Sequence, residues 1–275
     1  MNNLHRELAP ISDAAWTQIE EEAARTLKQY LSARRVVDVP PPKGPGTAAV
    51  GTGHVQKIEA PCEGAQAVQH AARPLVELRV PFALSRRAID DVERGALDSD
   101  WASLKDAARK IALAEDRSVF DGYAAAGIQG IRQAASNPIT TLPAAATGYP
   151  GAVARAVHHL RLAGVNGPYA LVLGADPYAV VSGGAEEGYP VQPHLERIVE
   201  GGIVWSPAIE GGLVLSTRGG DFELVVGQDI SIGYVGHSHS AVELYLQESF
   251  TFRVLTSEAA VALAAPKGKG SAADR

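Results

Sequence analysis

A run of thirteen residues with alternating hydrophobicity, VELYLQESFTFRV at 242–254, constrains the fold more than any other feature. Side chains along a β-strand point to opposite faces in turn, so the run predicts one strand well beyond the usual ~5–6 residues. We expect the apolar face to meet a core; it carries Val242, Leu244, Leu246, Phe250, Phe252 and Val254. We expect the other face to be solvated or paired with a neighbour; it carries Glu243, Tyr245, Gln247, Ser249, Thr251 and Arg253.

The segment PPPKGPGTAAVGTG, residues 40–53, excludes a helix or a central strand in this part of the chain. Proline fixes φ and removes a backbone donor, and glycine loosens the chain that follows. Short strand-like pieces continue through 53–83 with little apolar core of their own. The sequence therefore predicts an extended arm or hairpin.

Helical periodicity and buried runs account for the rest of the chain. Apolar residues at three- and four-residue steps predict helices over 12–33, 85–95 and 99–131. Ser12 is a suitable N-cap for the first helix, and Ser99 or Asp100 for the third. From residue 151 the pattern becomes α/β, with helices at 151–163 and about 192–200 and strands at 167–176, 203–206 and 212–217.

Composition excludes several classes of function. The 275 residues carry a net charge of -6, so a basic surface for nucleic acid is not expected. Cys62 is the only cysteine, which excludes an intramolecular disulfide and a thiolate metal cluster within the chain. No apolar run approaches the ~20 residues of a membrane span, and the N-terminal residues lack a secretory signal pattern. We therefore expect a cytoplasmic protein.

A glycine pair in STRGGDFELVVGQDISIGY, residues 216–234, raises the question of a phosphate loop. Such loops need a helix after the glycine turn, because the helix N-terminus supplies the amides that meet the anion. Gly219 and Gly220 are followed by the strand-like DFELVV instead. We interpret the pair as a tight turn between antiparallel strands, with glycine supplying positive φ.

The best metal candidate is the trio His237, His239 and Glu243, which would share a face if the segment were extended. A solvated polar turn is the alternative interpretation, and we expect no metal site. Neither G-x-S-x-G nor H-E-x-x-H occurs, and the acidic pairs are adjacent in sequence, so their side chains diverge. No catalytic residues are predicted.

Eight stretches, taken together, resemble the encapsulins, the linocin-like family of bacterial nanocompartment shell proteins. They occur in family order and cover the chain from Met1 to about Leu263. The stretches are MNNLHRELAPISDAAWTQIEEEAARTLK, ARRVVDV, FALSRRAIDDVERG, DSDWASLKDAARKIALAEDRSVFDGY, LRLAGVNGPYALVL, EGYPVQPHLERIV, STRGGDFELVVGQDISIGY and VELYLQESFTF.

The resemblance implies an α+β fold, the tailed-bacteriophage major capsid fold of Hong Kong 97 type. Its parts would be an N-terminal helical arm (1–39), an extended loop (40–83), a peripheral domain with a spine helix (84–134 plus 223–264), an axial domain (135–222) and a disordered tail (265–275). An arm without a core of its own fits this plan if it packs on a neighbouring subunit, as closed symmetric assembly requires.

The resemblance also implies a non-enzymatic shell protein that self-assembles into an icosahedral nanocompartment, with sixty subunits expected. The shell would enclose a cargo enzyme that carries a C-terminal targeting peptide. A dye-decolorizing peroxidase is expected ahead of a ferritin-like protein, so haem or iron would belong to the cargo. We expect no cofactor in this chain. Flavin is not predicted, because Arg87 stands where flavin-binding members have a tryptophan.

Two sets of site residues follow from the resemblance. The cargo peptide would dock in an apolar groove at the positions Leu27, Leu31, Arg34, Asp38, Asp229 and Ile230. The five-fold pore loop would include Gly183, Gly184, Glu186, Glu187, Gly188 and Tyr189. Repeated around an axis, the two glutamates would form an acidic ring that favours cations.

Two other functions remain as alternatives at this point. A phage or prophage major capsid protein would share the fold but would need a basic inner face for DNA, which the acidic net charge disfavours. A metal-dependent hydrolase would use the trio of His237, His239 and Glu243. It would require stoichiometric metal and activity in the isolated chain.

Overall fold

The predicted long strand is β12, Ala241–Val254, in a computed structural model that describes residues 3–186 and 188–266. The strand β3 (Val76–Ser85) pairs antiparallel with residues 241–250 of β12. The strands β11 (Ser231–His237) and β10 (Phe222–Val226) pair with successive parts of β12. Several residues of β12 that pair with β3 also pair with β11 or β10. A strand has only two edges, so β10 and β11 lie on the edge of β12 opposite β3.

Both faces of β12 are covered. Its apolar face packs against α3, and its polar face is paired with neighbours rather than solvated along the middle of the strand. Gln247, only 1% exposed, hydrogen-bonds with Arg79 and Glu77 of β3. The ring of Tyr245 lies under the Arg79 guanidinium, 4.2 Å from its centroid. Of the two predicted settings for this face, pairing with a neighbour is therefore confirmed.

Three helices flank this sheet: α1 (Asp13–Tyr30), α2 (Arg86–Glu93) and α3 (Ala102–Phe120). Ser12 caps α1 as predicted, accepting a hydrogen bond from the Ala15 N–H at 3.3 Å. Asp100 accepts from the Ala102 N–H at the start of α3. Ile19, Leu104, Leu244 and other apolar residues of these elements form one buried cluster.

The third helix is shorter than the predicted 99–131. It ends at Phe120 because Gly122 adopts φ 93°, which an L-residue disfavours, and the backbone of Gly130 lies directly against it. A Tyr123–Ile128 bridge, the 3₁₀ turn η3 (Ala124–Ala126) and the short helix α4 (Ile131–Ala134) follow. The periodicity beyond 120 was therefore wrongly assigned to the same helix.

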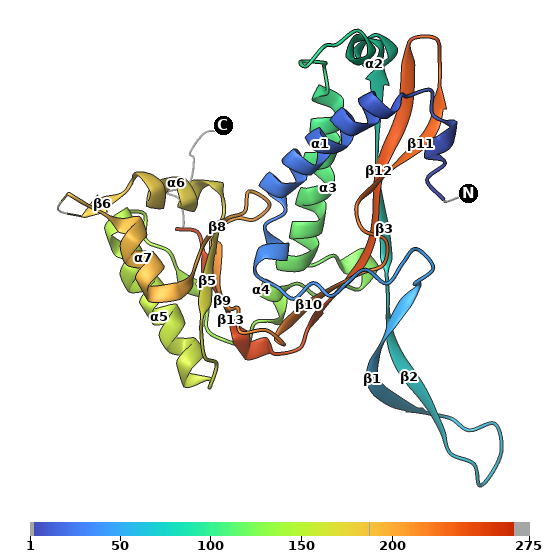
Figure 1. Ribbon diagram of the computed structural model, residues 1–275. Coiled ribbons are helices and arrows are strands. Elements are labelled where there is room, and N and C mark those ends of the chain that lie inside the picture. Colours follow the sequence, from blue (N-terminus) through green and yellow to red (C-terminus); the bar gives the residue numbers. More distant parts are fainter. Residues whose placement is uncertain (1–2, 187, 267–275) are drawn as a thin grey trace, which may run out of the picture.

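A second, five-stranded sheet has the order β4-β13-β9-β5-β8 and forms the left part of Figure 1. Its strands are β4 (Thr140–Thr141), β13 (Ala260–Ala264), β9 (Gly212–Ser216), β5 (Tyr169–Leu173) and β8 (Glu200–Trp205). The associated helices are α5 (Tyr149–Leu162), α6 (Ala175–Gly183) and α7 (Val191–Val199).

Two features of this sheet differ from the sequence-based expectation. The helix α6 was not predicted. The strand β13, which the sequence analysis placed with 223–264 in the peripheral part, pairs with β9 and β4 instead. Its all-apolar sequence AVALA suits a strand buried on both faces.

The predicted arm is a two-stranded hairpin of β1 (Ala49–Ile58) and β2 (Ala67–Pro74), which projects away from the rest of the chain in Figure 1. The two strands pair only with each other, and nearly all their residues are exposed or half-buried. Val55 and Val68 are 54% and 56% exposed. Among the described residues, therefore, the hairpin has no core to pack on.

The glycine pair connects the two sheets. Gly219 and Gly220 have φ of 86° and 79°, so the positive φ predicted for them is confirmed. The flanking strands β9 and β10 do not pair with each other, however, because they belong to different sheets. Most of the predicted disordered tail, residues 267–275, lies outside the described part of the chain.

Substituting Gly130 tests the close backbone contact at which α3 ends. A Cβ at this position would lie 2.2 Å from the Gly122 backbone nitrogen, so Gly130→Ala forces the backbone apart. We expect a loss of about 1–3 kcal/mol or more in stability. Gly46→Ala is the control, since a Cβ there meets nothing within 4 Å. Thermal unfolding of both variants, followed by circular dichroism, makes the comparison; equal midpoints would contradict the expectation.

Candidate functional site

The segment after α1 is fastened to α3 by one buried carboxylate. Asp116 accepts hydrogen bonds from the backbone N–H groups of Ser32 at 3.0 Å and Ala33 at 2.9 Å, and from the Ser32 hydroxyl. Burial raises the pKa of Asp116 to about 7, although these donors favour the ionised form. The contact fixes where the chain leaves α1 and therefore where Arg34 lies.

Arg34 joins three elements through its guanidinium group. Its Nε lies 2.9 Å from both carboxylate oxygens of Glu115 on α3. Nη1 donates to Asp229 Oδ1 at 2.8 Å, and Nη2 approaches Glu248 Oε2 of β12 at 3.5 Å. Burial opposes the charge on Arg34, but Glu115 and Asp229 outweigh that effect and raise its pKa. The cation is therefore permanent.

Glu248 is the functional candidate that the sequence analysis missed. Its side chain is fully buried, and its Oε1 has no hydrogen-bond partner among the described residues. Burial, and then the neighbouring Glu115, raise the pKa of Glu248 well above its usual range. A signal was present, because Glu248 is the one charged residue on the apolar face of the alternating run.

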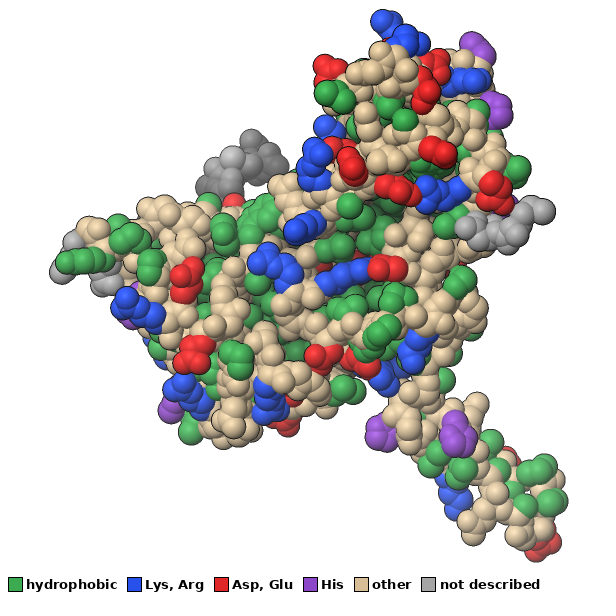
Figure 2. All heavy atoms as spheres, viewed as in Figure 1, with side chains coloured by type: hydrophobic (Ala, Val, Ile, Leu, Met, Phe, Trp, Pro, Cys, Tyr) green, Lys and Arg blue, Asp and Glu red, His purple; other side chains and the backbone are tan. Residues whose placement is uncertain are grey.

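Near this cluster, half-buried apolar side chains of α1, of β11 and of the segment that leads into β11 pack on one shared core, and we call this set the α1–β11 seam. It consists of the half-buried side chains Trp16, Leu27, Ile230 and Tyr234, which pack on the core cluster of α1, α2, α3, β3, β11 and β12. On the face shown in Figure 2, hydrophobic side chains gather near the centre, beside a short row of acidic and basic side chains. An apolar strip with charges at its end suits an extended peptide, because the charges can fix its register.

The structure brings most of the predicted docking residues to this seam. Leu27 and Ile230 belong to it, and the Arg34–Asp229 ion pair lies next to Ile230. Leu31 is half-buried at the C-terminal cap of α1, where its N–H bonds to the Leu27 carbonyl. These five residues therefore lie around the junction of α1 with the loop before β11.

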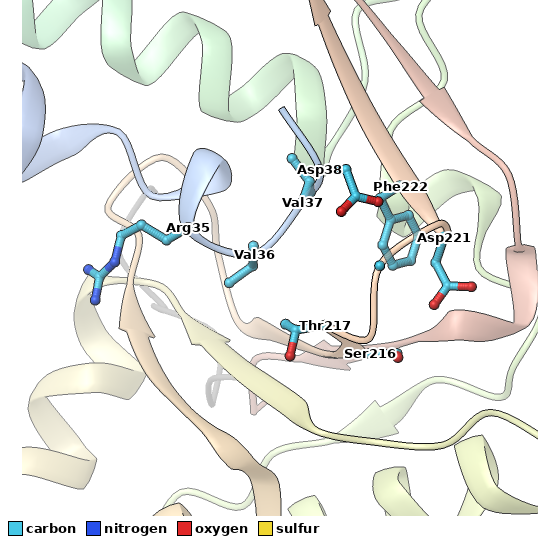
Figure 3. Close-up of a pocket in the computed structure, with 9 residues that line it drawn as sticks. Arg35, Val36, Val37, Asp38, Ser216, Thr217, Asp221 and Phe222 are labelled. Carbon is cyan, nitrogen blue, oxygen red and sulfur yellow. The ribbon is translucent and has the colours of Figure 1, made fainter. Parts of the chain in front are cut away.

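Asp38 lies elsewhere, at the start of β10. Its N–H bonds to the Phe222 carbonyl, and its Oδ2 accepts from the Gly220 N–H at 2.6 Å. It lines a small pocket of about 100 Å³ between residues 35–38 and 216–222 (Figure 3). The other acid there, Asp221, is paired with Arg218 at 2.9 Å. Both carboxylates are thus used in holding the glycine turn.

The predicted pore loop follows α6. Gly183 ends the helix and Gly184 caps it. Two short strands, β6 (Ala185–Glu186) and β7 (Tyr189–Pro190), then pair antiparallel, with Gly188 at φ 87°. Tyr189 is 78% exposed at this tip. Glu187 lies outside the described residues.

The described residues contain no group of three or more His, Cys, Asp or Glu side chains that could hold a metal ion. His237 instead hydrogen-bonds with the Tyr234 hydroxyl, and His239 lies in the exposed turn between β11 and β12. Cys62 is exposed. The geometry therefore gives no support to the trio of His237, His239 and Glu243 as a metal site.

Comparison with known proteins identifies the family. The family model described as "Encapsulating protein for peroxidase" (Linocin_M18) matches residues 1–251. The chain belongs to this family. It is 55% identical to the type 1 encapsulin shell protein of Rhodococcus erythropolis over 264 residues, which cover 96% of this chain and 100% of the relative.

Solved structures agree on the fold. The virus-like particle from Pyrococcus furiosus aligns with a TM-score of 0.63 at 18% identity, covering 90% of this chain and 98% of the other. The capsid of Myoviridae phage XM1 aligns with a TM-score of 0.54 at 10% identity, covering 85% and 91%. The fold is therefore the tailed-phage major capsid fold of Hong Kong 97 type, as the family resemblance implied. Among the described residues, no helix is both long and apolar enough to cross a membrane.

Removing the carboxylate of Asp116 tests whether its hydrogen bonds hold the segment that follows α1 against α3. Asp116→Ala leaves two buried backbone N–H groups without partners, and we expect a loss of about 3 kcal/mol in stability. Asp106→Ala is the matched control on the same helix, because its ion pair with Lys110 is exposed to solvent. Chemical denaturation of both variants measures the difference. Equal losses would contradict the assignment.

Proposed function

We propose that the chain is the shell protein of an icosahedral encapsulin nanocompartment, built from sixty copies in the bacterial cytoplasm. The observation that carries this proposal is the 55% identity to an encapsulin shell protein along that relative's whole length. The capsid fold and the hairpin that lacks a core support it, since a neighbouring copy would cover the hairpin. The work of this chain is then assembly, and any catalysis belongs to the cargo.

The proposed cargo is a dye-decolorizing peroxidase that carries a C-terminal targeting peptide. The family description, "Encapsulating protein for peroxidase", supports a peroxidase cargo. The peptide would dock along the α1–β11 seam, where Leu27 and Ile230 provide apolar contacts and the Arg34–Asp229 pair provides charges. Haem would be held by the cargo, and this chain would bind neither cofactor nor metal.

The loop after α6 is proposed as the lining of the five-fold pore. Its short β6–β7 pairing and exposed Tyr189 suit a tip that meets copies of itself around an axis. Glu186 and Glu187 would repeat there, giving an acidic ring that favours the entry of cations.

A major capsid protein that packages DNA remains a second candidate, because it would have the same fold. The family match and the net charge of -6 favour the nanocompartment. The two candidates differ in their contents: protein in one case and nucleic acid in the other.

Expression of the chain alone tests the assembly. We expect uniform hollow particles of sixty 28.8 kDa chains, seen by negative-stain imaging and weighed by light scattering. Ultraviolet absorbance should show no packaged nucleic acid. A monomer or dimer of ordinary size would refute the shell, and particles rich in DNA would favour the capsid candidate.

Placing a charge at the predicted docking residues tests the docking site. Ile230→Asp and, separately, Leu31→Asp should leave the shells intact but empty, because a carboxylate in an apolar contact with the peptide is costly to desolvate. Val235→Asp, on β11 shortly after Ile230 and at a side chain that is 59% exposed, serves as the control. Peroxidase that co-purifies with the shells is measured against shell mass. Unchanged loading in both Ile230→Asp and Leu31→Asp would refute the assignment.

A further inference from the structure

The strongest unexplained feature is the number of acidic groups around Arg34. Glu115 and Glu248 are both fully buried, and Asp229, with a side chain that is 50% exposed, is the third carboxylate in contact with the guanidinium. A single cation therefore faces three carboxylates, two of which are shielded from water. Two buried carboxylates that share one cation do not both stay charged without a large desolvation cost.

The contacts show which of the three carboxyl groups interacts least with Arg34. Glu115 receives a two-pronged bond from Arg34, with both oxygens at 2.9 Å. Asp229 receives a bond at 2.8 Å and reaches solvent. Glu248 has only the long 3.5 Å approach, and its Oε1 has no partner. Glu248 is therefore the carboxyl group whose negative charge Arg34 would compensate least.

We propose that Glu248 is protonated and uncharged, and that Arg34 is thereby held between Glu115 and Asp229 beside the α1–β11 seam. Loss of the proton adds a buried negative charge opposite Nη2. The guanidinium then turns inward toward Glu248 and releases Asp229, whose loop leads directly into Ile230. The loop at Asp229 and Ile230 is thus held by Arg34 when Glu248 is neutral and is released when Glu248 ionises.

The surroundings contain no second cation to compensate. The β12 pairing places Leu78 of β3 opposite Glu248. The neighbouring Glu77 and Arg79 bond with Gln247 on the other face of the sheet. Asp116, the adjacent acid on α3, bonds with Ser32 and Ala33. Arg34 is therefore the only cation among the charged groups that face Glu248 in the described part of the chain.

The direction of the pH effect follows from linkage. Burial and the charge of Glu115 raise the pKa of Glu248 in the folded protein above its value in the unfolded chain. The contribution of this carboxyl is therefore complete at low pH and is lost as the pH rises through the folded-state pKa. We expect release of the loop on the alkaline side. A glutamine at this position, always neutral, should remove the dependence.

Hydrogen exchange on empty shells tests the proton-linked contact without any cargo. Wild type and Glu248→Gln are compared at the same pH, from about pH 6 to about pH 10, so that intrinsic base catalysis cancels. At the alkaline end we expect about tenfold faster exchange at residues 228–231 in the wild type, and equal rates at the acidic end. Glu243→Gln, exposed on the same strand, should behave as the wild type does. Equal exchange in wild type and Glu248→Gln throughout would overturn the proposal.

A second measurement concerns docking, and this part rests on the proposed function. The probe is a fluorescent protein fused to the C-terminal segment of the peroxidase that co-purifies with the shells. Wild-type shells should lose affinity for it by about tenfold at the alkaline end, and Glu248→Gln shells should retain it. Affinity that is independent of pH in the wild type would overturn the link to docking. Absence of binding at every pH, with the exchange difference intact, would refute the docking function and leave the proton-linked contact supported.

Discussion

A half-buried cation among carboxylates joins several elements of the fold. Arg34 is held by Glu115 of α3, by Glu248 of β12 and by Asp229 of the loop between β10 and β11. Removing Arg34 would leave Glu115 as an uncompensated buried charge, which costs far more than a surface ion pair contributes. The position of the first helix relative to the long strand is therefore specified by charge as well as by apolar packing.

The seam follows from that arrangement. The buried face of α1, with Ala15, Ile19 and Ala23, packs on the shared core. Trp16, Leu27 and Ile230 remain half-buried on that same core. When the apolar stripe of a helix is wider than the face that its own chain covers, the uncovered apolar side chains can contact another chain. An extended peptide is a suitable occupant, because the charged Arg34–Asp229 pair adjoins Ile230 and can fix the register of the peptide.

The sequence predicted the helices and strands whose periodicity reflects burial on one face, such as 12–33 and 242–254. It failed where tertiary contacts override the local pattern. The helix from 99 ends at Phe120 because Gly122 and Gly130 touch through their backbones, a contact invisible in the local sequence. The strand β13 lies in a sheet whose other members come from residues 140–216. Long-range pairing of that kind has no signature within AVALA itself.

For the candidate site, the resemblance supplied the positions and the structure supplied their relations. Leu27, Ile230, Arg34 and Asp229 lie together, whereas Asp38 holds the glycine turn at the far end of β10. Glu248 could have been recognised as the charged interruption of an apolar face. Its meaning was not accessible from sequence, because that meaning depends on Glu115 and Arg34, which are distant in the chain.

The β1–β2 hairpin couples the stability of the protomer to its association with other copies. An isolated two-stranded hairpin is marginally stable in water at best, and β1–β2 has no third strand or core among the described residues. Its exposed Val55 and Val68 would be covered only by another chain. Ordering of the hairpin and association of subunits are then one process, so the stability of the protomer depends on the concentration of its copies. A subunit that has lost its neighbours therefore also loses the ordered structure of its hairpin.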